Sequence, residues 1–126
     1  MRLATLAIAL LLAAPAAAQD LIASYTAYIG QADLHNSNGQ RLREPWQILR
    51  QDRANFHRYG IRQFADEYDP VFGSMEARAQ MDSLLRQGQI TPEARRAILR
   101  GDLIVHVQVW GWGNRLHSVR VQTERF

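Results

Sequence analysis

Alternating apolar and polar positions predict one strand near the start of the chain and two near its end. Between residues 21 and 29, Ser24 and Thr26 lie on one parity, and the other parity is occupied by Leu21, Ala23, Tyr25, Ala27 and Ile29. A period of two is typical of a strand with one buried face. The segments 103–112 and 115–123 repeat this alternation and meet at a Gly-Asn pair, which predicts a β-hairpin.

Apolar positions spaced three and four apart predict three helices in the middle of the chain. Each stretch begins at a capping residue or a proline and ends at a glycine, as helices commonly do. The predicted helices run from Pro45 to about Tyr59, from a cap at Ser74 to about Gln87, and from Thr91 to Gly101. The expected packing residues of the second helix are Met75, Met81, Leu84 and Leu85.

Arg53 breaks the pattern of the first helix. It projects into the apolar side of that helix, beside Trp46 and Leu49. A long side chain can carry its charge out to solvent, whereas an unpaired buried charge is very costly. Arg53 is therefore expected either to reach solvent or to meet a carboxylate.

The order of the predicted elements, β-α-α-α-β-β, indicates a small α+β domain. We expect a three-stranded antiparallel sheet with the helices packed on one face and the N-terminal strand beside the hairpin. Residues 19–126 are enough for one hydrophobic core and are expected to form a single domain.

The valines of the hairpin indicate how its two strands pair. Residues directly opposite each other lie on the same face of a sheet. A three-residue loop over 112–114 sets Val107 opposite Val119. We expect Gly113 or Asn114 in this loop to adopt the left-handed conformation.

The first 18 residues have the layout of a secretory signal peptide. Arg2 supplies the positive start and is followed by an apolar run over residues 3–14, which is too short to span a bilayer. Residues 16–18 are the small residues that precede cleavage. We expect cleavage after Ala18 and a protein that works in the periplasm or outside the cell.

Composition excludes several classes of function. The chain has no cysteine, so disulfide scaffolds, thiol catalysis and cysteine–zinc sites are excluded. All 15 basic residues are arginine, and loss of Arg2 with the signal peptide leaves 14 against 12 acids. Acids and arginines are interleaved, and so small an excess is not typical of nucleic-acid binding. No second stretch approaches the roughly 20 apolar residues of a spanning helix, so the exported chain is not expected to cross a membrane.

The best set of side chains for binding lies on the face of the hairpin opposite the valines. In the expected register His106 lies opposite Arg120, and Trp110 lies opposite Leu116. Two tryptophans beside polar and cationic groups form a flat platform for sugar rings or for a partner protein. The alternative is that a helix or a second copy covers this face and the tryptophans belong to the core. The predicted binding residues are Trp110, Trp112, His106, Gln108 and Arg120.

A second candidate surface is the basic side of the first helix. Arginines and a histidine gathered there could hold a phosphate, an acidic glycan or an anionic lipid surface. A charged helix face that is simply solvated is the alternative. The predicted anion-binding residues are Arg43, Arg50, His57 and Arg58.

Three acids, Asp66, Glu67 and Asp69, lie between the first two helices. Oxygen ligands so close together suit calcium. The same carboxylates could instead pair with Arg53 or with the basic side of the first helix, and we favour this pairing because so many arginines are near in sequence. The sequence also lacks zinc-binding spacings and a phosphate-cradling glycine loop, so we predict no metal and no cofactor.

These observations favour a small exported module that binds a cell-envelope component or another envelope protein through the Trp-rich face of the hairpin. The alternative is a small exported hydrolase that uses a histidine and a carboxylate as an acid–base pair. Its candidate residues are His57 or His106 with Asp66 or Asp69. A histidine beside a carboxylate in a concave pocket would favour the hydrolase, and an exposed flat Trp face would favour the binding module.

Overall fold

The computed structural model describes residues 18–88 and 90–124. The predicted signal peptide, apart from Ala18, lies outside the described residues. Within them the strands and α-helices follow the predicted order, with one short 3₁₀ helix in addition. The elements are β1 (Asp20–Ile29), η1 (Gln31–Leu34), α1 (Pro45–His57), α2 (Met75–Gln87), α3 (Pro92–Arg100), β2 (Leu103–Trp112) and β3 (Arg115–Glu124).

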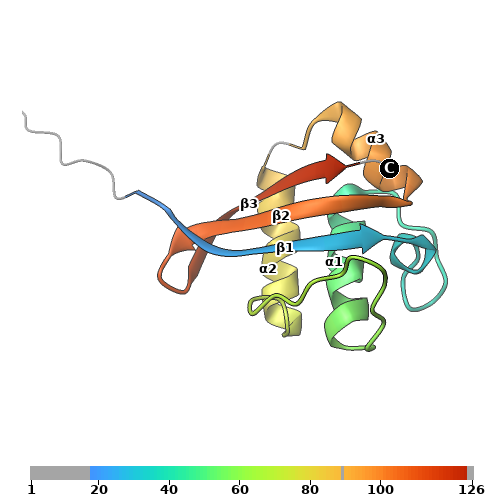
Figure 1. Ribbon diagram of the computed structural model, residues 1–126, viewed down its shortest axis with the longest axis horizontal. Helices are drawn as coiled ribbons and strands as arrows, with labels where there is room; N and C mark the ends of the chain where they lie inside the picture. The colour runs from blue at the N-terminus through green and yellow to red at the C-terminus, as the bar shows by residue number, and fades with distance from the viewer. Residues whose placement is uncertain (1–17, 89, 125–126) are drawn as a thin grey trace, which may run out of the picture.

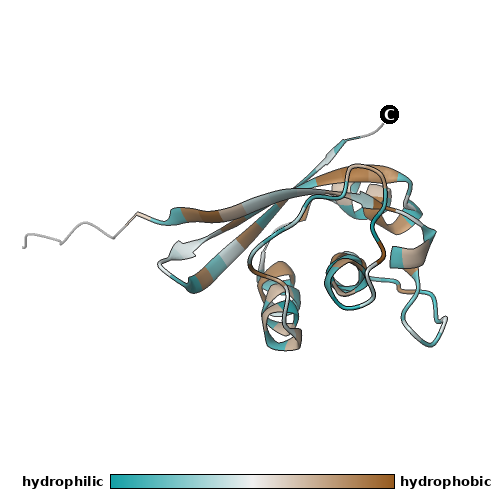
Figure 2. Cartoon of the chain, turned by 60° about the horizontal axis from the view of Figure 1, so that its bottom comes forward, coloured by the Kyte–Doolittle hydropathy of each residue, from teal (hydrophilic) through white to brown (hydrophobic). Residues whose placement is uncertain are grey.

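The three strands form one antiparallel sheet in the order β1-β2-β3 (Figure 1). Figure 2 shows α1 and α2 together on one side of this sheet. The α+β fold class predicted from the sequence is confirmed, and so is the place of the N-terminal strand beside the hairpin. No helix in the described part of the chain is long and apolar enough to cross a membrane.

The helix ends follow the local signals of the sequence. The side chains of Ser74 and Thr91 accept hydrogen bonds from backbone N–H groups three residues later, which caps α2 and α3. Gly101 ends α3 with a φ of 75°, a conformation that residues with a Cβ rarely adopt. Helix α1 ends at His57, two residues earlier than predicted.

The prediction that Met75 is a packing residue of α2 is wrong, because 57% of this residue is exposed. At 100° per residue, Met75 lies roughly a quarter turn away from the line of Met81 and Leu85 along the helix surface. Those two residues do pack in the core. The start of α2 therefore presents an apolar side chain to solvent.

The core lies between the sheet and the helices. Alternate residues of β2 point into it, and each of them is buried. The sheet contributes Tyr25, Ala27, Ile29, Leu103, Val105, Val107, Val109 and Val119, and the α-helices contribute Ile48, Leu49, Phe56, Met81, Leu85, Ala94, Ala97 and Ile98.

The hairpin loop has two residues, Gly113 and Asn114, so the predicted three-residue loop is wrong. Gly113 has a φ of 58°, which confirms a left-handed residue in the loop. Gly111 lies so close to the returning strand that an added Cβ would be 1.9 Å from the carbonyl oxygen of Arg115. The tip therefore requires glycine at two positions.

The hairpin strands are also shifted by two residues from the predicted pairing. Val107 lies opposite Val121 rather than Val119, which faces Val109. One extra residue in β3, His117, forms a bulge. Without this bulge, a two-residue loop would place the valines of β3 on the opposite face from those of β2. The prediction that the valines of both strands lie on one face of the sheet is confirmed. The predicted register is wrong.

A bulge near the start of β1 changes the side on which Leu21 lies. The pairing with β2 shifts between Leu21 and Ala23, which makes Ile22 the extra residue. Ile22 packs against the core. Leu21, predicted to be buried, is exposed on the other face opposite Trp110.

Candidate functional site

The face of the sheet that points away from the helices carries no buried side chain among the described residues. We call this surface the open face. It consists of Leu21, Ser24, Thr26 and Tyr28 of β1, Ile104, His106, Gln108, Trp110 and Trp112 of β2, and Ser118, Arg120, Gln122 and Glu124 of β3. All five predicted binding residues lie on this face, and the helices of the chain lie on the opposite one.

Trp110 is held in place by polar neighbours on the open face. The guanidinium carbon of Arg120 lies 4.8 Å from the centre of the Trp110 ring, a cation–π contact. The indole N–H donates to Oε1 of Gln108 over 3.3 Å. Ser118 lies directly opposite Trp110 in the sheet. Trp110 is therefore an oriented aromatic ring with hydrogen-bonding groups of β2 and β3 beside it and Leu21 on the β1 side.

Trp112 lies at the tip of the hairpin and is 37% exposed. Its ring contacts the imidazole of His117 with the ring centres 4.9 Å apart. Since His117 is the bulged residue, the bulge itself adds a second ring to the tip. Figure 1 shows the tip extending past α2, so this end of the open face stands clear of the helices.

His106 joins all three strands in the middle of the open face. Its Nδ1 lies 3.2 Å from Oγ1 of Thr26 on β1, and its Nε2 lies 2.7 Å from Oε2 of Glu124 on β3. Sequence reasoning missed Thr26 and Glu124 as members of the site. The alternation of polar and apolar residues in each strand indicates on which face Thr26 and Glu124 lie. Only the pairing of the strands shows that both lie next to His106.

The observed register corrects two pairs predicted for this face. Arg120 lies opposite Gln108 rather than His106. Leu116 pairs beyond the bulge and packs against the core rather than facing Trp110. The predicted residue set is therefore on one face, but its neighbours are arranged differently.

An apolar hollow with a volume of about 370 Å³ lies against the hairpin tip. It is lined by residues of the tip, of the start of β1, of the segment before α2 and of α2 itself. These are Ile22, Pro70, Val71, Ala77, Gln80, Gly113, Asn114 and Leu116. The tip thus has aromatic rings on the open face and an apolar hollow on its core side.

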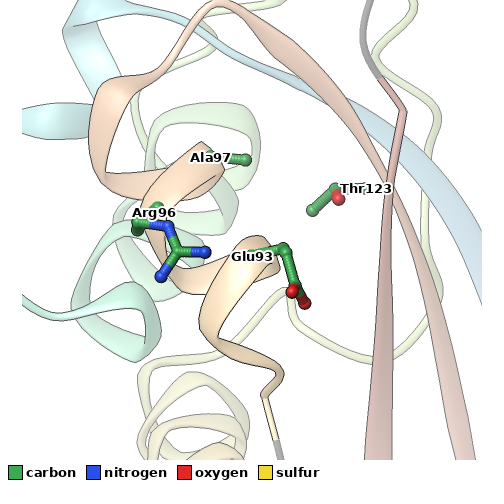
Figure 3. Close-up of a pocket in the computed structure, with 4 residues that line it drawn as sticks. All are labelled: Glu93, Arg96, Ala97 and Thr123. Carbon is green, nitrogen blue, oxygen red and sulfur yellow. The ribbon is translucent and has the colours of Figure 1, made fainter.

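A second hollow of about 370 Å³ lies between α3 and β3 (Figure 3). Glu93, Arg96 and Ala97 line it from α3, and Thr123 lines it from β3. These four residues supply one acid, one base and no aromatic ring. This hollow therefore offers a ligand less surface for recognition than the open face does.

Arg53 lies beneath the sheet and is fully buried. Its Nε is 2.8 Å from Oδ2 of Asp52, and its Nη1 is 2.9 Å from Oδ2 of Asp69. The rings of Tyr25 and Phe56 lie 4.1 Å and 4.6 Å from the guanidinium carbon. We call these five residues the Arg53 cluster. Of the two alternatives expected for Arg53, the structure shows the second, because Arg53 meets carboxylates and does not reach solvent.

The two carboxyl groups of the Arg53 cluster differ in how readily they ionise. Burial acts against ionisation of Asp69, yet hydrogen bonds from His57, the backbone of Phe72 and Arg53 lower its pKa. Burial raises the pKa of Asp52 well above its ordinary value, with Arg53 acting in the opposite direction. Asp69 is therefore the carboxyl partner of Arg53 whose ionised form the surroundings favour.

Asp33 lies buried in η1 and accepts two hydrogen bonds. The backbone N–H of Gly30 donates to it over 2.9 Å, and the Asn55 amide donates over 2.9 Å. Burial raises the pKa of Asp33 to about 6, although these two hydrogen bonds act to lower it. Asp33 therefore titrates at a pH at which most carboxyl groups are ionised.

His57 and Asp69 form one of the histidine–carboxylate pairs that the hydrolase alternative requires. Nε2 of His57 lies 2.7 Å from Oδ2 of Asp69. The other oxygen of Asp69 accepts the backbone N–H groups of Val71 and Phe72. Only 10% of the His57 side chain is exposed. Asp69 is thus already engaged on both oxygens, which makes the pair a structural link between α1 and the segment before α2.

The four predicted anion-binding residues are not equally accessible. Arg50 forms an ion pair with Asp82 at 3.3 Å. His57 contacts the buried Asp69, as described above. Arg43 and Arg58 are the exposed members of the set. An anion site on this side of α1 stays a prediction that rests on these two arginines.

The acids between α1 and α2 bond to groups of the chain itself. Asp69 binds Arg53, as predicted. Asp66 and Glu67 instead accept hydrogen bonds from backbone N–H groups, two of which belong to the edge of β1. Within residues 18–88 and 90–124 no group of three or more acidic or histidine side chains is arranged to hold a metal ion.

Comparisons of the chain with protein-family models, with curated proteins and with solved structures found no match. Function therefore has to be inferred from the surfaces described above. Among them the open face combines aromatic, amide and charged side chains on surface that the helices leave uncovered.

Proposed function

We propose that this protein is an exported module that binds a cell-envelope component through the open face of its sheet. The N-terminal pattern of Arg2 and an apolar run supports export to the periplasm or beyond the cell. The observation that carries the binding role is the position of Trp110 and Trp112. Both rings lie on a sheet face that the helices leave uncovered.

A glycan suits this face better than the other envelope components. The faces of sugar rings are apolar and pack on flat aromatic surface, which tryptophan provides with little loss of side-chain entropy. The amide of Gln108 and the guanidinium of Arg120 flank the Trp110 ring and match the hydroxyl and carboxylate groups of an acidic sugar. Arg120 is exposed, so it can leave the ring and meet a ligand.

Tryptophan fluorescence offers a direct test. Titration with soluble peptidoglycan fragments should change the emission of the native protein and raise its melting temperature. A ligand present at 100 times its dissociation constant adds about 2.7 kcal/mol to the free energy of unfolding. Trp112→Ala should remove most of this response while the protein stays folded, because the ring is partly exposed at the hairpin tip.

Trp46→Phe is the matched control, since Trp46 packs against the core away from the open face. This variant should keep the full binding response. If no glycan shifts the melting temperature, but Trp112→Ala abolishes co-purification with an identified envelope protein, the open face belongs to a protein partner. If neither ligand class depends on Trp110 or Trp112, the proposal is wrong.

A hydrolase is the second candidate, and the contact between His57 and Asp69 is the observation that favours it. In such an enzyme His57 would act as the base and Asp69 would orient it. Hydrolysis of an ester or glycoside that is lost in His57→Gln but kept in Trp112→Ala would support this reading. Loss of stability in His57→Gln without any detectable turnover by the native protein would leave the pair with its structural role.

A further inference from the structure

Exposed apolar side chains gather in one short segment of the chain. Four of the seven large apolar residues that are exposed in the described part lie within residues 59–68. Phe64 and Tyr68 are the most exposed of all, at 72% and 69%, and Tyr59 and Ile61 accompany them. We call residues 58–69 the aromatic loop. Exposed apolar side chains concentrated in one segment indicate a contact surface.

The aromatic loop is fastened to the sheet along its inner side. The backbone N–H of Glu67 donates to the carbonyl of Thr26 over 2.8 Å, and Asp66 accepts the backbone N–H of Tyr28 over 2.8 Å. Arg53 donates to the carbonyl of Glu67 from below. These bonds fix the backbone, so the aromatic side chains are held outside rather than folding onto the core.

The acidic and basic side chains of the aromatic loop have different surroundings. The carboxylates of Asp66 and Glu67 bond the edge of β1. Arg58 and Arg62 are exposed. The guanidinium carbon of Arg62 lies 4.5 Å from the centre of the Phe56 ring, which places this charge beside the root of the loop. The exposed aromatic rings and arginines therefore lie in a loop whose acids Asp66 and Glu67 are bonded to backbone N–H groups.

We propose that the aromatic loop docks the protein on the surface of a bilayer that contains anionic phospholipid. Phe and Tyr side chains are favoured at the boundary between headgroups and acyl chains, and arginines are attracted to anionic headgroups. An anionic headgroup layer repels free carboxylates, and here backbone N–H groups hold both oxygens of Asp66 and Oε1 of Glu67. Arg58 and Arg62 are both exposed and can meet anionic headgroups. Docking is peripheral and leaves the open face free for its own ligand.

Vesicle co-sedimentation tests this proposal with vesicles of phosphatidylglycerol and phosphatidylcholine, against vesicles of phosphatidylcholine alone. The native protein should sediment with the anionic vesicles at low salt and less so as the salt concentration rises. The double variant Phe64→Ser, Tyr68→Ser should lower the partition coefficient at least about tenfold, because two rings no longer enter the interface. Arg58→Gln and Arg62→Gln should each lower it about fivefold, and only on anionic vesicles.

Two substitutions elsewhere serve as matched controls. Met75→Ser removes an exposed apolar side chain outside the loop, and Arg96→Gln removes an exposed arginine of α3. Both should leave the partition coefficient unchanged. All chains are compared with the same N-terminus, determined by mass spectrometry, and with unchanged circular dichroism, so that differences belong to the substituted side chains.

Two outcomes would overturn the proposal. The first is vesicle binding that is absent or that ignores both the aromatic and the arginine substitutions. The second is a change of oligomeric state in Phe64→Ser, Tyr68→Ser without any change in vesicle binding, which would assign the loop to a contact between protein chains. Analytical ultracentrifugation of the same samples without vesicles distinguishes this second outcome.

Discussion

The Arg53 cluster beneath the sheet and the open face above it use the same kinds of side chain in opposite surroundings. In each, an arginine lies over an aromatic ring, Arg53 over Tyr25 and Arg120 over Trp110. Each also has a carboxylate 2.7 Å from a histidine Nε2, Asp69 beside His57 and Glu124 beside His106. Arg53 is fully buried, whereas Arg120 is exposed. Residue type alone therefore does not separate structure from function in this protein.

Burial decides what each of these two regions can do. Inside, a charge without its partner costs several kcal/mol, so the Arg53 cluster is fixed in one arrangement. Outside, an ion pair contributes at most about 1 kcal/mol, so a ligand can replace it at little cost. The buried region therefore holds α1 to the segment before α2, whereas the contacts of the exposed region can be exchanged. Four substitutions or conditions test this contrast.

Asp69→Asn should have the largest effect. It removes the buried carboxylate that bonds Arg53 and His57, and it turns an amide N–H₂ toward their donors. The expected loss in the free energy of unfolding is about 3–5 kcal/mol, measured by urea denaturation. Glu93→Gln, on the exposed surface of α3, should change stability by less than about 0.5 kcal/mol. A loss of under about 1 kcal/mol for Asp69→Asn would mean that solvent reaches Arg53 after all.

The next largest effect is expected from ionisation of Asp33, which should make the free energy of unfolding depend on pH. Its pKa is about 6 in the folded protein and 3.8 in the reference state, so the unfolded chain loses the proton first as pH rises. The contribution of Asp33 to stability should therefore fall by about 3 kcal/mol between about pH 4 and pH 6. Urea denaturation across this range should show the fall in the native protein, and Asp33→Asn should lack it. Equal slopes for the two chains would contradict the assignment.

Gly111→Ala tests the hairpin tip, where Gly111 on the core side of β2 is followed by Trp112 on the open face. The added Cβ would lie 1.9 Å from the carbonyl oxygen of Arg115, so the backbone of the tip must move. We expect a loss of about 1–3 kcal/mol in thermal unfolding and weaker binding at Trp112. Gly73→Ala is the control, because its Cβ would meet its nearest neighbour at an ordinary 3.8 Å. Equal melting temperatures for the two variants would show that the tip tolerates a side chain.

Glu124→Gln should have the smallest effect on stability. It weakens the contact with His106 on the open face, where 60% of the Glu124 side chain is exposed. The expected change is below about 1 kcal/mol in urea denaturation, several times smaller than for the buried Asp69. A change as large as that of Asp69→Asn would erase the distinction between the two regions.

The elements of the fold were predictable because their signals are local. Capping at Ser74 and Thr91 and the alternation along β2 depend on neighbours within a few residues. The register of the hairpin was not predictable in the same way. The bulges at Ile22 and His117 depend on how the strands meet each other and the core, and each shifts the pairing without a distinct sequence signal.

The candidate sites show the same limit. The position of Arg53 on α1 predicts the need for a carboxylate and leaves its identity open, because Asp69 reaches it only through an irregular segment. The parity of β2 places Trp110, Trp112 and His106 together on one face, as observed. The companions of His106 come from two other strands, so they depend on a topology that composition and spacing do not determine.

The hydrogen bonds between the aromatic loop and β1 also affect how this sheet can meet another one. A free strand edge is a template for further strands, and a sheet with two free edges can grow into a fibre. Here Asp66 and Glu67 occupy backbone groups of Thr26 and Tyr28 on the β1 side. A strand arriving there must first displace three hydrogen bonds, so lateral growth is directed to the edge at β3. Two copies that join through that single edge form a closed pair, and the association stops there.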